Sequence, residues 1–218
     1  MYSYTLYFCL LLGGLTNLQS TRLLLGKLLM TINKHELSQA LLALTTQGVI
    51  AYPTESVFGL GCDPDSEVAI QKILDLKQRP AHKGLILIAA NIEQLQRYAD
   101  FSSLSAKQLD NINATWPGPF TWVVPVQASL LKLVSGDFDS IAVRVTQHPV
   151  VQTLCTAFGK PIISTSANLS GEQACTSTQE VEQMFVNHPL LDYVIDQPVT
   201  GLENPSQIHD ALTGKRLR

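Results

Sequence analysis

The chain has 218 residues, of which 45% are hydrophobic and 15% charged, a composition that favours a folded protein with a sizeable core and excludes wholesale disorder. Its formal net charge of -3 argues against a protein that coats nucleic acid or an anionic membrane through its overall field. The four cysteines form no C-x-x-C pair and the five histidines form no H-E-x-x-H pattern, so a zinc hydrolase finds no support.

The first 29 residues differ in pattern from the rest of the chain. Tyr4–Leu15 is apolar but too short to span a membrane, and no Lys or Arg precedes it as in a signal peptide. Globular patterning starts at Met30. We therefore predict an atypical N-terminal extension over residues 1–29, either a non-native start or disordered, and one domain over residues 30–218. The alternative for the extension is a weak export signal or a membrane-surface anchor.

The first predicted element of the domain is an amphipathic helix over residues 32–46, with leucines at helical spacing and Asn33 with Glu36 as a capping pair. A short strand over residues 49–52 follows and leads into a glycine-bearing turn. The G-x-G in this turn lacks the third glycine of a dinucleotide fingerprint, so we reject a Rossmann site.

The next predicted helix carries a lysine in line with its apolar stripe. Ile70, Ile73, Leu74 and Lys77 fall on one face at i, i+3, i+4 and i+7. A proline shortly afterwards ends the helix, which therefore presents Lys77 and Arg79 from its last turn. These cations are candidates for binding an anion, and the competing interpretation is that they only complement the helix dipole.

Later elements are shorter. Two helices are predicted over residues 91–98 and 105–112, and a last strand over residues 193–195. The basic tail over residues 215–218 is predicted to be a solvated end. Helices that alternate with short buried strands predict an α/β domain with a partly parallel sheet.

Arg144 lies on a predicted strand over residues 141–145. Ile141, Val143 and Val145 face one side of this strand, and Arg144 faces the other. An arginine opposite a clean apolar face is a candidate anion clamp. The alternatives are a solvated sheet face and a structural salt bridge.

Residues 160–171 place an apolar strand directly before a cluster of small hydroxyl and amide side chains, which includes Ser164, Ser166 and Asn168. Such side chains suit a ligand rich in oxygen, although an ordinary loop uses them only to bond its own turns. Neither a G-x-S-x-G elbow nor a Walker A loop is present. Cations on separate elements with this neutral cluster therefore suit phosphoryl or nucleotidyl transfer by positioning.

Several motifs together resemble the YrdC family in its short bacterial form. They are Y-P-T-E-S-V-F-G-L-G at 52–61, L-K-Q-R-P at 76–80, W-P-G-P at 116–119, A-V-R-V at 142–145 and S-T-S-A-N-L-S-G at 164–171. The resemblance implies a single α/β domain with a twisted mixed sheet, flanking helices and a concave basic ligand site. It also implies threonylcarbamoyl-AMP synthase activity, in which L-threonine, bicarbonate and ATP give threonylcarbamoyl-AMP and pyrophosphate for tRNA modification.

The resemblance also assigns roles to individual residues. Lys77 and Arg79 are implied to be catalytic and to face the ATP phosphates, with Arg144 as the clamp for the threonine carboxylate. The residues implied to bind ATP and threonine beside them are Thr54, Ser56, Ser164, Ser166 and Asn168. Alanine at Lys77 or Arg79 is expected to abolish activity and leave the fold intact.

The implied cofactor is Mg²⁺ carried with ATP, without a dedicated protein metal site. The implied partners are ATP, L-threonine, bicarbonate and downstream threonylcarbamoyl-transferase proteins acting on tRNA, with weak RNA binding as an accessory property. The implied location is the cytoplasm, with no membrane partner.

The chain departs from the family pattern at three places. Ser56 stands where the family often has threonine, and Lys83 with Gly84 stands where longer members carry N-P-L and then a histidine, so that histidine contact does not carry over. The arginine that some relatives place before the turn at residues 201–206 is missing, so closure over the nucleotide by this segment is not expected.

Two alternative functions stay open at this point. One is carbamoyl-adenylate chemistry as in hydrogenase maturation, although this chain lacks the acylphosphatase unit and zinc fingers of those proteins. The other is an RNA- or tRNA-binding module, whose affinity would fall steeply with salt.

Overall fold

The computed structural model describes residues 32–218. The extension predicted for residues 1–29 lies outside the described residues, so that boundary stays a prediction. None of the helices in the described part is both long enough and apolar enough to cross a membrane.

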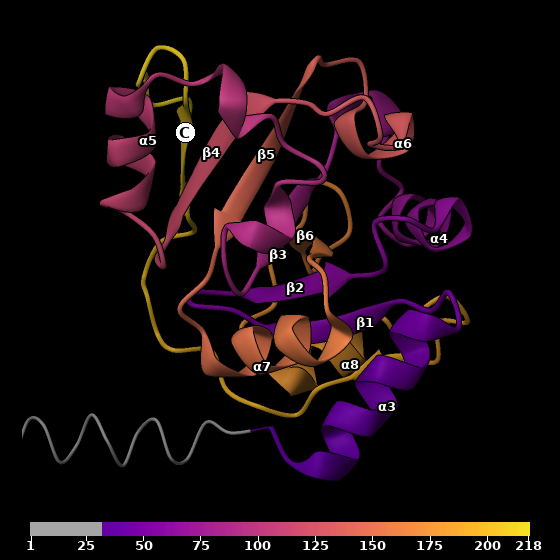
Figure 1. The fold of residues 1–218 in the computed structure, drawn as a ribbon. Coiled ribbons are helices and arrows are strands. Elements are labelled where there is room, and N and C mark those ends of the chain that lie inside the picture. Colours follow the sequence, from indigo (N-terminus) through magenta and orange to yellow (C-terminus); the bar gives the residue numbers. More distant parts are fainter. Residues whose placement is uncertain (1–31) are drawn as a thin grey trace, which may run out of the picture. The chain divides into compact units, whose positions relative to one another are not determined.

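One mixed sheet of eight strands, in the order β7-β1-β2-β6-β3-β5-β4-β8, organises the domain. Strands β1 and β2 run at a steep angle to β4 and β5, so the sheet is strongly twisted (Figure 1). The strands are β1 (Ile50–Pro53), β2 (Phe58–Gly61), β3 (Ile86–Ala89), β4 (Phe120–Pro125), β5 (Ser140–Val145), β6 (Ile162–Ser166), β7 (Tyr193–Val194) and β8 (Gln207–Asp210).

Pairing in the sheet is partly parallel, as predicted. Strands β3 and β5, β4 and β8, and β1 and β7 pair in parallel, whereas β6 pairs antiparallel with both β2 and β3. The expected α/β class with a mixed sheet is therefore confirmed.

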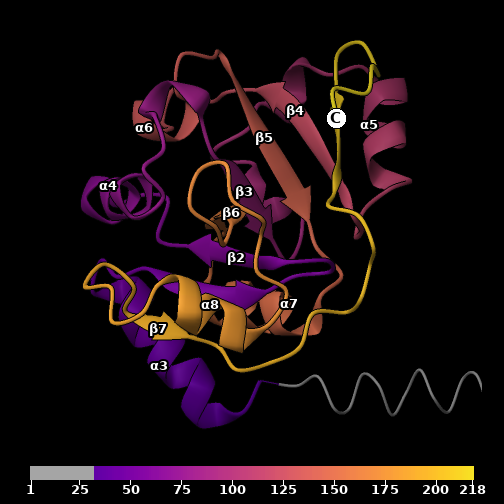
Figure 2. The same ribbon diagram turned by 180° about the vertical axis from the view of Figure 1, so that it is seen from behind.

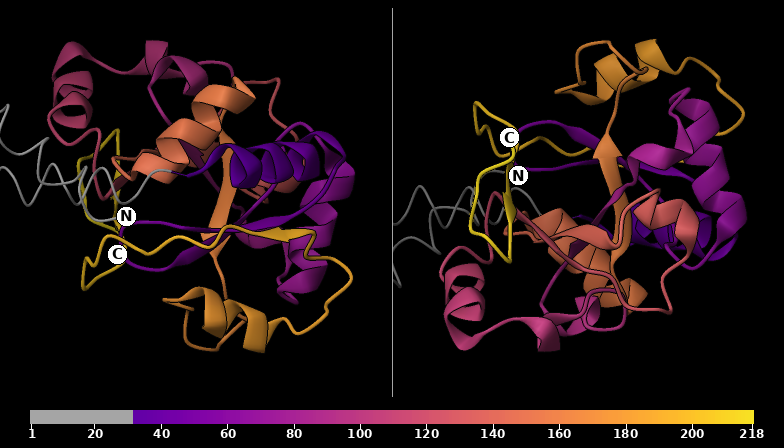
Figure 3. Two further views of the ribbon diagram at one scale, coloured as in Figure 1. Left: turned by 90° about the horizontal axis from the view of Figure 1, so that it is seen from below. Right: turned by 90° about the horizontal axis from the view of Figure 1, so that it is seen from above.

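Helices flank the sheet on both faces (Figures 2 and 3). The α-helices are α3 (Lys34–Thr45), α4 (Glu67–Leu76), α5 (Ala106–Asn113), α6 (Lys132–Ser135), α7 (Pro149–Phe158) and α8 (Thr178–Met184). The capping pair predicted for the first of them is present, because Asn33 Oδ1 accepts from the Glu36 backbone at 2.9 Å and Glu36 Oε2 accepts from the Asn33 backbone at 3.3 Å.

The helix predicted over residues 91–98 is wrong, because only a 3-10 turn, η2 (Glu93–Leu95), forms there. Its apolar residues Ile92, Leu95 and Tyr98 recur at intervals of three, which fits the three-residue repeat of a 3-10 turn better than an α-helix. A further 3-10 turn, η3 (Phe101–Ser103), leads on to α5.

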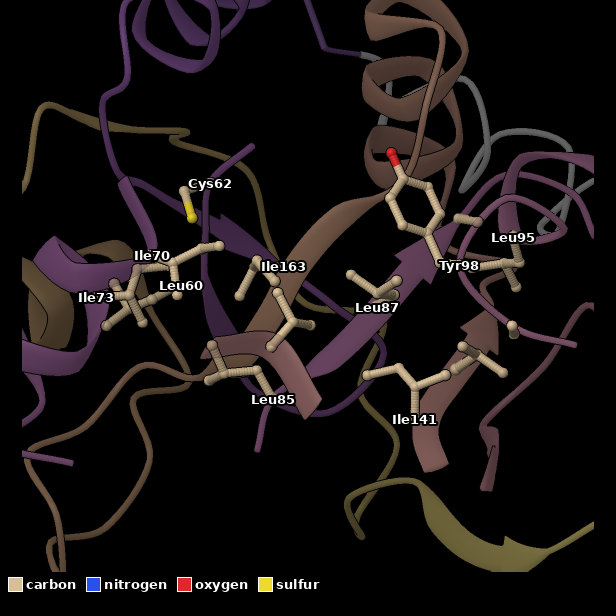
Figure 4. Packing of buried hydrophobic residues seen from close by; sticks show 14 of the residues in the cluster. Leu60, Cys62, Ile70, Ile73, Leu85, Leu87, Leu95, Tyr98, Ile141 and Ile163 are labelled. Atoms are coloured by element: carbon tan, nitrogen blue, oxygen red, sulfur yellow. The ribbon is translucent and has the colours of Figure 1, made fainter. Parts of the chain in front are cut away.

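Alternation along the strands divides the core in two. The larger cluster includes Leu87, Ile141 and Ile163 and packs one face of the sheet (Figure 4). The smaller cluster includes Ile88 and Ile162 from the opposite face, packed against α3 and α7. These two helices cover only part of that face.

The two glycines of the G-x-G motif, which was rejected as a dinucleotide site, allow neighbouring residues of the sheet to pack closely. Gly61 lies on β2, where a Cβ would come within 2.7 Å of the Tyr52 ring and of the Ile163 carbonyl oxygen. The tyrosine is fully buried against this glycine. The motif therefore lets β1, β2 and β6 approach closely and does not form a dinucleotide turn.

Candidate active site

A cavity of about 690 Å³ lies on the part of the sheet face that α3 and α7 leave uncovered. This volume is within the range of small-molecule and cofactor sites, roughly 300–1,000 Å³. Its floor comes from alternate positions on four strands, namely Ile86, Ile88, Thr121, Val123, Ala142, Arg144 and Ser164. The strand alternation that buries Ile141, Val143 and Val145 thus directs Arg144 into the cavity.

The cavity brings together seven of the eight residues predicted for the site: Thr54, Ser56, Arg79, Arg144, Ser164, Ser166 and Asn168. Cationic residues on its wall, Arg79, Lys83, Arg144 and Arg218, outnumber the acidic ones, Glu172 and Asp210. The wall therefore favours an anionic ligand. The eighth predicted residue, Lys77, is not part of the wall.

Lys77 lies behind the serine-rich loop and is only 3% exposed. Its ammonium donates to the Ser166 carbonyl oxygen, to the Asn168 carbonyl oxygen at 2.8 Å and to Asn168 Oδ1 at 3.0 Å. An ammonium has three hydrogens, so these three acceptors satisfy it fully. Lys77 therefore fastens the loop from beneath in the described conformation.

The side chain of Asn168 is also used within the loop. Its Oδ1 accepts from Ser166 Oγ at 2.6 Å, and its Nδ2 donates to the carbonyl oxygens of Leu169 and Glu172 at 2.9 and 2.8 Å. Together with Lys77, the asparagine forms one network that fixes the loop. The loop then presents backbone and hydroxyl groups to the cavity, while the Asn168 side-chain amide stabilises the conformation of the loop.

Arg79 reaches the cavity because α4 ends in a Schellman motif. Gln78 adopts a left-handed conformation with φ of 50°, and the Arg79 backbone N–H donates to the Leu74 carbonyl oxygen at 2.8 Å. The guanidinium donates from Nη2 to the Gly84 carbonyl oxygen at 2.8 Å. The predicted helix end is confirmed, and it turns Arg79 away from Lys77, onto the cavity wall.

Gly84 allows the loop after Arg79 to approach α6. Its φ is +61°, and a Cβ at this position would come within 2.9 Å of the Ser135 carbonyl oxygen. A side chain here would displace the segment that carries the carbonyl partner of Arg79. The 3-10 turn η1 (Ala81–Lys83) precedes this glycine.

Arg144 is 8% exposed and forms an ion pair through Nη2 with Oε2 of Glu55. Burial lowers the pKa of Arg144 to about 10. The adjoining carboxylate acts in the opposite direction, so the guanidinium is charged at neutral pH. Glu55 was not among the residues predicted for the site. Its position directly after a buried strand was nevertheless a signal that its carboxylate is buried and needs a cationic partner.

The C-terminal segment also borders the cavity, through Pro205, Ser206, Ile208, Asp210, Leu217 and Arg218. The tail over residues 215–218 is exposed, as predicted for a solvated end, and it also folds back on β8, where the Leu217 N–H donates to the Ile208 carbonyl oxygen at 2.7 Å. Pro205 and Ser206 of the segment over residues 201–206 therefore border the cavity, while the expectation that this segment does not close over the nucleotide stays a prediction. Main-chain pairing of β8 with β4 brings them there without an arginine before the turn.

Most of the chain is similar to known proteins of one family. A family model for Sua5, YciO and YrdC proteins, described as "Telomere recombination", matches residues 42–218. The threonylcarbamoyl-AMP synthase of Psychromonas ingrahamii is 65% identical over 191 residues, which are 88% of this chain and 100% of that protein. The threonylcarbamoyl-AMP synthase of Vibrio campbellii is 56% identical over 180 residues, 83% of this chain and 96% of that protein.

A solved structure of similar fold is that of P. abyssi Sua5 complexed with L-threonine, with a TM-score of 0.76 and 30% sequence identity. The match covers 83% of this chain and 52% of that longer chain. The fold, the motifs on the cavity wall and the extent of these matches lead to one conclusion: the chain belongs to the Sua5/YciO/YrdC family.

Proposed function

We propose that the protein is a threonylcarbamoyl-AMP synthase, a nucleotidyltransferase that converts L-threonine, bicarbonate and ATP into threonylcarbamoyl-AMP and pyrophosphate. The observation that carries this proposal is the meeting of Arg79 and Arg144 with a wall of neutral hydroxyls in one cavity. The names of the relatives, at 65% and 56% identity, support the same activity.

The reaction needs a site that holds two anionic substrates in line. The threonine amine combines with bicarbonate, by way of CO2, to give a carbamate with release of water, and a carbamate oxygen then attacks the α-phosphorus of ATP with loss of pyrophosphate. Arg79 neutralises charge on the phosphates, and Arg144 holds the threonine carboxylate. Thr54, Ser56, Ser164 and Ser166 supply neutral donors and acceptors to both substrates.

A covalent enzyme intermediate is not needed for this chemistry, and the described cysteines do not favour one. Cys62, Cys155 and Cys175 are buried free thiols. Burial raises the pKa of Cys155 to about 12 and that of Cys62 well above its usual value, so neither is a thiolate at neutral pH. Catalysis by positioning fits such a site.

Magnesium is proposed to arrive with ATP. In the part of the chain that the structure describes, only Glu172 and Asp210 bring carboxylate side chains to the cavity, and Asp210 Oδ1 already accepts from the backbone of Leu212 and Thr213. Among residues 32–218 there is no group of three His, Cys, Asp or Glu side chains that could hold an ion. Mg²⁺ coordinated by substrate phosphates and water fits these residues, and it would stabilise negative charge on the phosphates.

The lability of the product determines which protein must act next. Both the carbamate and the adenylate are labile in water, so the product must pass quickly to a threonylcarbamoyl-transferase that acts on tRNA. We place this sequence of reactions in the cytoplasm.

Substrate omission tests the proposed function. We expect pyrophosphate release from ATP only when threonine and bicarbonate are both present, with serine a poorer substrate than threonine. Release is measured by a coupled phosphate assay, and the adenylate is identified by mass spectrometry. Pyrophosphate release that does not depend on threonine contradicts the proposal.

The pH dependence of ATP binding tests the role of Lys77. Burial, and then the neighbouring Arg79 cation, lower the pKa of Lys77 from 10.5 to about 8. As the pH rises through this value the ammonium loses a proton, and the neutral amine has only two hydrogens for three acceptors. We therefore expect calorimetric affinity for ATP, measured without threonine, to fall between about pH 7 and pH 9.

Lys77→Met removes the titrating group and provides the control. This variant should bind ATP weakly and with no pH dependence over the same range. If it retains the pH dependence of the original protein, another group is responsible.

A further inference from the structure

Glu55 lies immediately behind the cavity wall, on the loop between β1 and β2. It is 2% exposed and does not line the cavity, although its neighbours Thr54 and Ser56 do. Its Oε1 accepts from Thr146 Oγ1 at 2.8 Å and from the Gln147 backbone N–H at 3.2 Å. Its Oε2 pairs with Arg144. The carboxylate thus connects the end of β5 with the guanidinium on the cavity floor.

The loop that carries Glu55 does not need this carboxylate to hold its backbone. The Thr54 N–H donates to the Val57 carbonyl oxygen at 3.0 Å, and the Leu202 N–H donates to the Glu55 carbonyl oxygen at 2.9 Å. A buried ion pair also contributes little net stability, because desolvation of both charges offsets their attraction. The pair therefore calls for an explanation other than fold stability.

The orientation of Arg144 supplies that explanation. Its Nε and Nη2 are buried in protein, whereas Nη1 is not among the buried atoms that lack a partner. Among the described residues, Nε and Nη2 have no hydrogen-bond partner, so the contact of Nη2 with Glu55 is an ion pair. A long, flexible side chain would lose this orientation without a fixed partner behind it, and a preorganised donor binds its ligand with less entropic cost.

We propose that Glu55 is a positioning residue for threonine binding, which acts by holding Arg144 with its free guanidinium edge toward the substrate carboxylate. This inference rests on the proposed function, because it takes threonine as the ligand of Arg144. Thr146 and Gln147 fix the carboxylate, and the carboxylate fixes the guanidinium. Glu55 itself touches neither substrate.

Glu55→Gln tests the inference, because the amide oxygen can still accept from Thr146 and Gln147 while the charge that holds Arg144 is lost. We expect the KM for threonine and the calorimetric Kd for threonine to rise on the order of 10- to 100-fold, as for a misplaced substrate-positioning group. The KM for ATP should change less than about twofold, and kcat at saturating threonine should be largely retained. Glu55→Asp keeps the charge on a shorter side chain and should recover part of the threonine affinity.

Glu36→Gln is the matched control. Glu36 is also a buried carboxylate, 8% exposed, but it caps α3 and accepts from Asn33 and Gln197, and none of these three residues lines the cavity. This variant should lower thermal stability and leave the KM for threonine unchanged. A purely structural role of Glu55 predicts the same behaviour for Glu55→Gln.

A double variant decides whether Glu55 acts through Arg144. In an Arg144→Ala background, Glu55→Gln should cause no further loss of threonine affinity. An additive loss of threonine affinity in the double variant overturns the inference. So does Glu55→Gln alone, if it raises the KM values for ATP and threonine equally or leaves the KM for threonine unchanged. Failure of the proposed function is seen separately, as a lack of threonine-dependent pyrophosphate release in the unmodified protein. If Glu55→Gln does not fold, Glu55→Asp gives the same readouts.

Discussion

Alanine in place of Arg79 is expected to reduce threonine- and bicarbonate-dependent pyrophosphate release by on the order of 100- to 1,000-fold, the usual loss when one preorganised donor to developing charge is removed. Arg79 lies on the cavity wall with its guanidinium held by the Gly84 carbonyl oxygen. A positively charged side chain held in this way neutralises phosphate charge without reorganising during the reaction. Steady-state kinetics should locate the loss in kcat/KM for ATP.

Stability should change little in this variant, because Arg79 makes one short side-chain hydrogen bond, to Gly84. Arg97→Ala is the control, since the Arg97 side chain is 66% exposed and pairs at the surface with Asp65. It should keep full activity. Full activity in Arg79→Ala would exclude the proposed role of Arg79 in phosphate binding.

Alanine in place of Lys77 is expected to have two effects, since Lys77 is a buried support of the loop. Three acceptors, on Ser166 and Asn168, each lose one donor. The Ser166 carbonyl oxygen and Asn168 Oδ1 keep a second donor, whereas the Asn168 carbonyl oxygen is left without one, so we expect the free energy of unfolding to fall by about 1–3 kcal/mol. Urea unfolding measures this loss, and ATP affinity should fall with it.

Lys72→Ala on the same helix is the matched control. Lys72 donates from Nζ to the Gln47 carbonyl oxygen at 2.9 Å at the surface, so its removal should be nearly neutral. The sequence-based expectation that Lys77→Ala leaves the fold intact is thus revised. Wild-type stability and ATP affinity in Lys77→Ala would contradict the supporting role.

Local patterns predicted most elements of the fold because the periodicity of apolar residues is a local property. The alternation at Ile141, Val143 and Val145 predicted that Arg144 faces away from the core, and the structure agrees. The helical spacing of Ile70, Ile73 and Leu74 likewise predicted α4 and its end before Pro80. Strand β8 was missed because it is short and only partly buried, so its sequence carries a weak pattern.

The sequence by itself determined which side chains could form the site. The motifs and their resemblance named seven residues that line one cavity, and the helix end at Lys77 set the spacing of the two cations. Both inferences rest on local chemistry, because each feature is recognised from a short stretch of sequence. One is a strand end followed by small polar residues, and the other is a helix that ends before a proline.

Only the tertiary structure decided what each of these side chains does. Lys77 is separated from its partner Asn168 by 91 residues, and Glu55 is separated from its donor Thr146 by 91 residues. Such pairs depend on strand order and on which face of the sheet the helices leave open. Burial also decides whether a cation faces the cavity, as Arg79 does on the wall, or supports the wall from behind, as Lys77 does. Residue type and spacing along the chain do not contain that information.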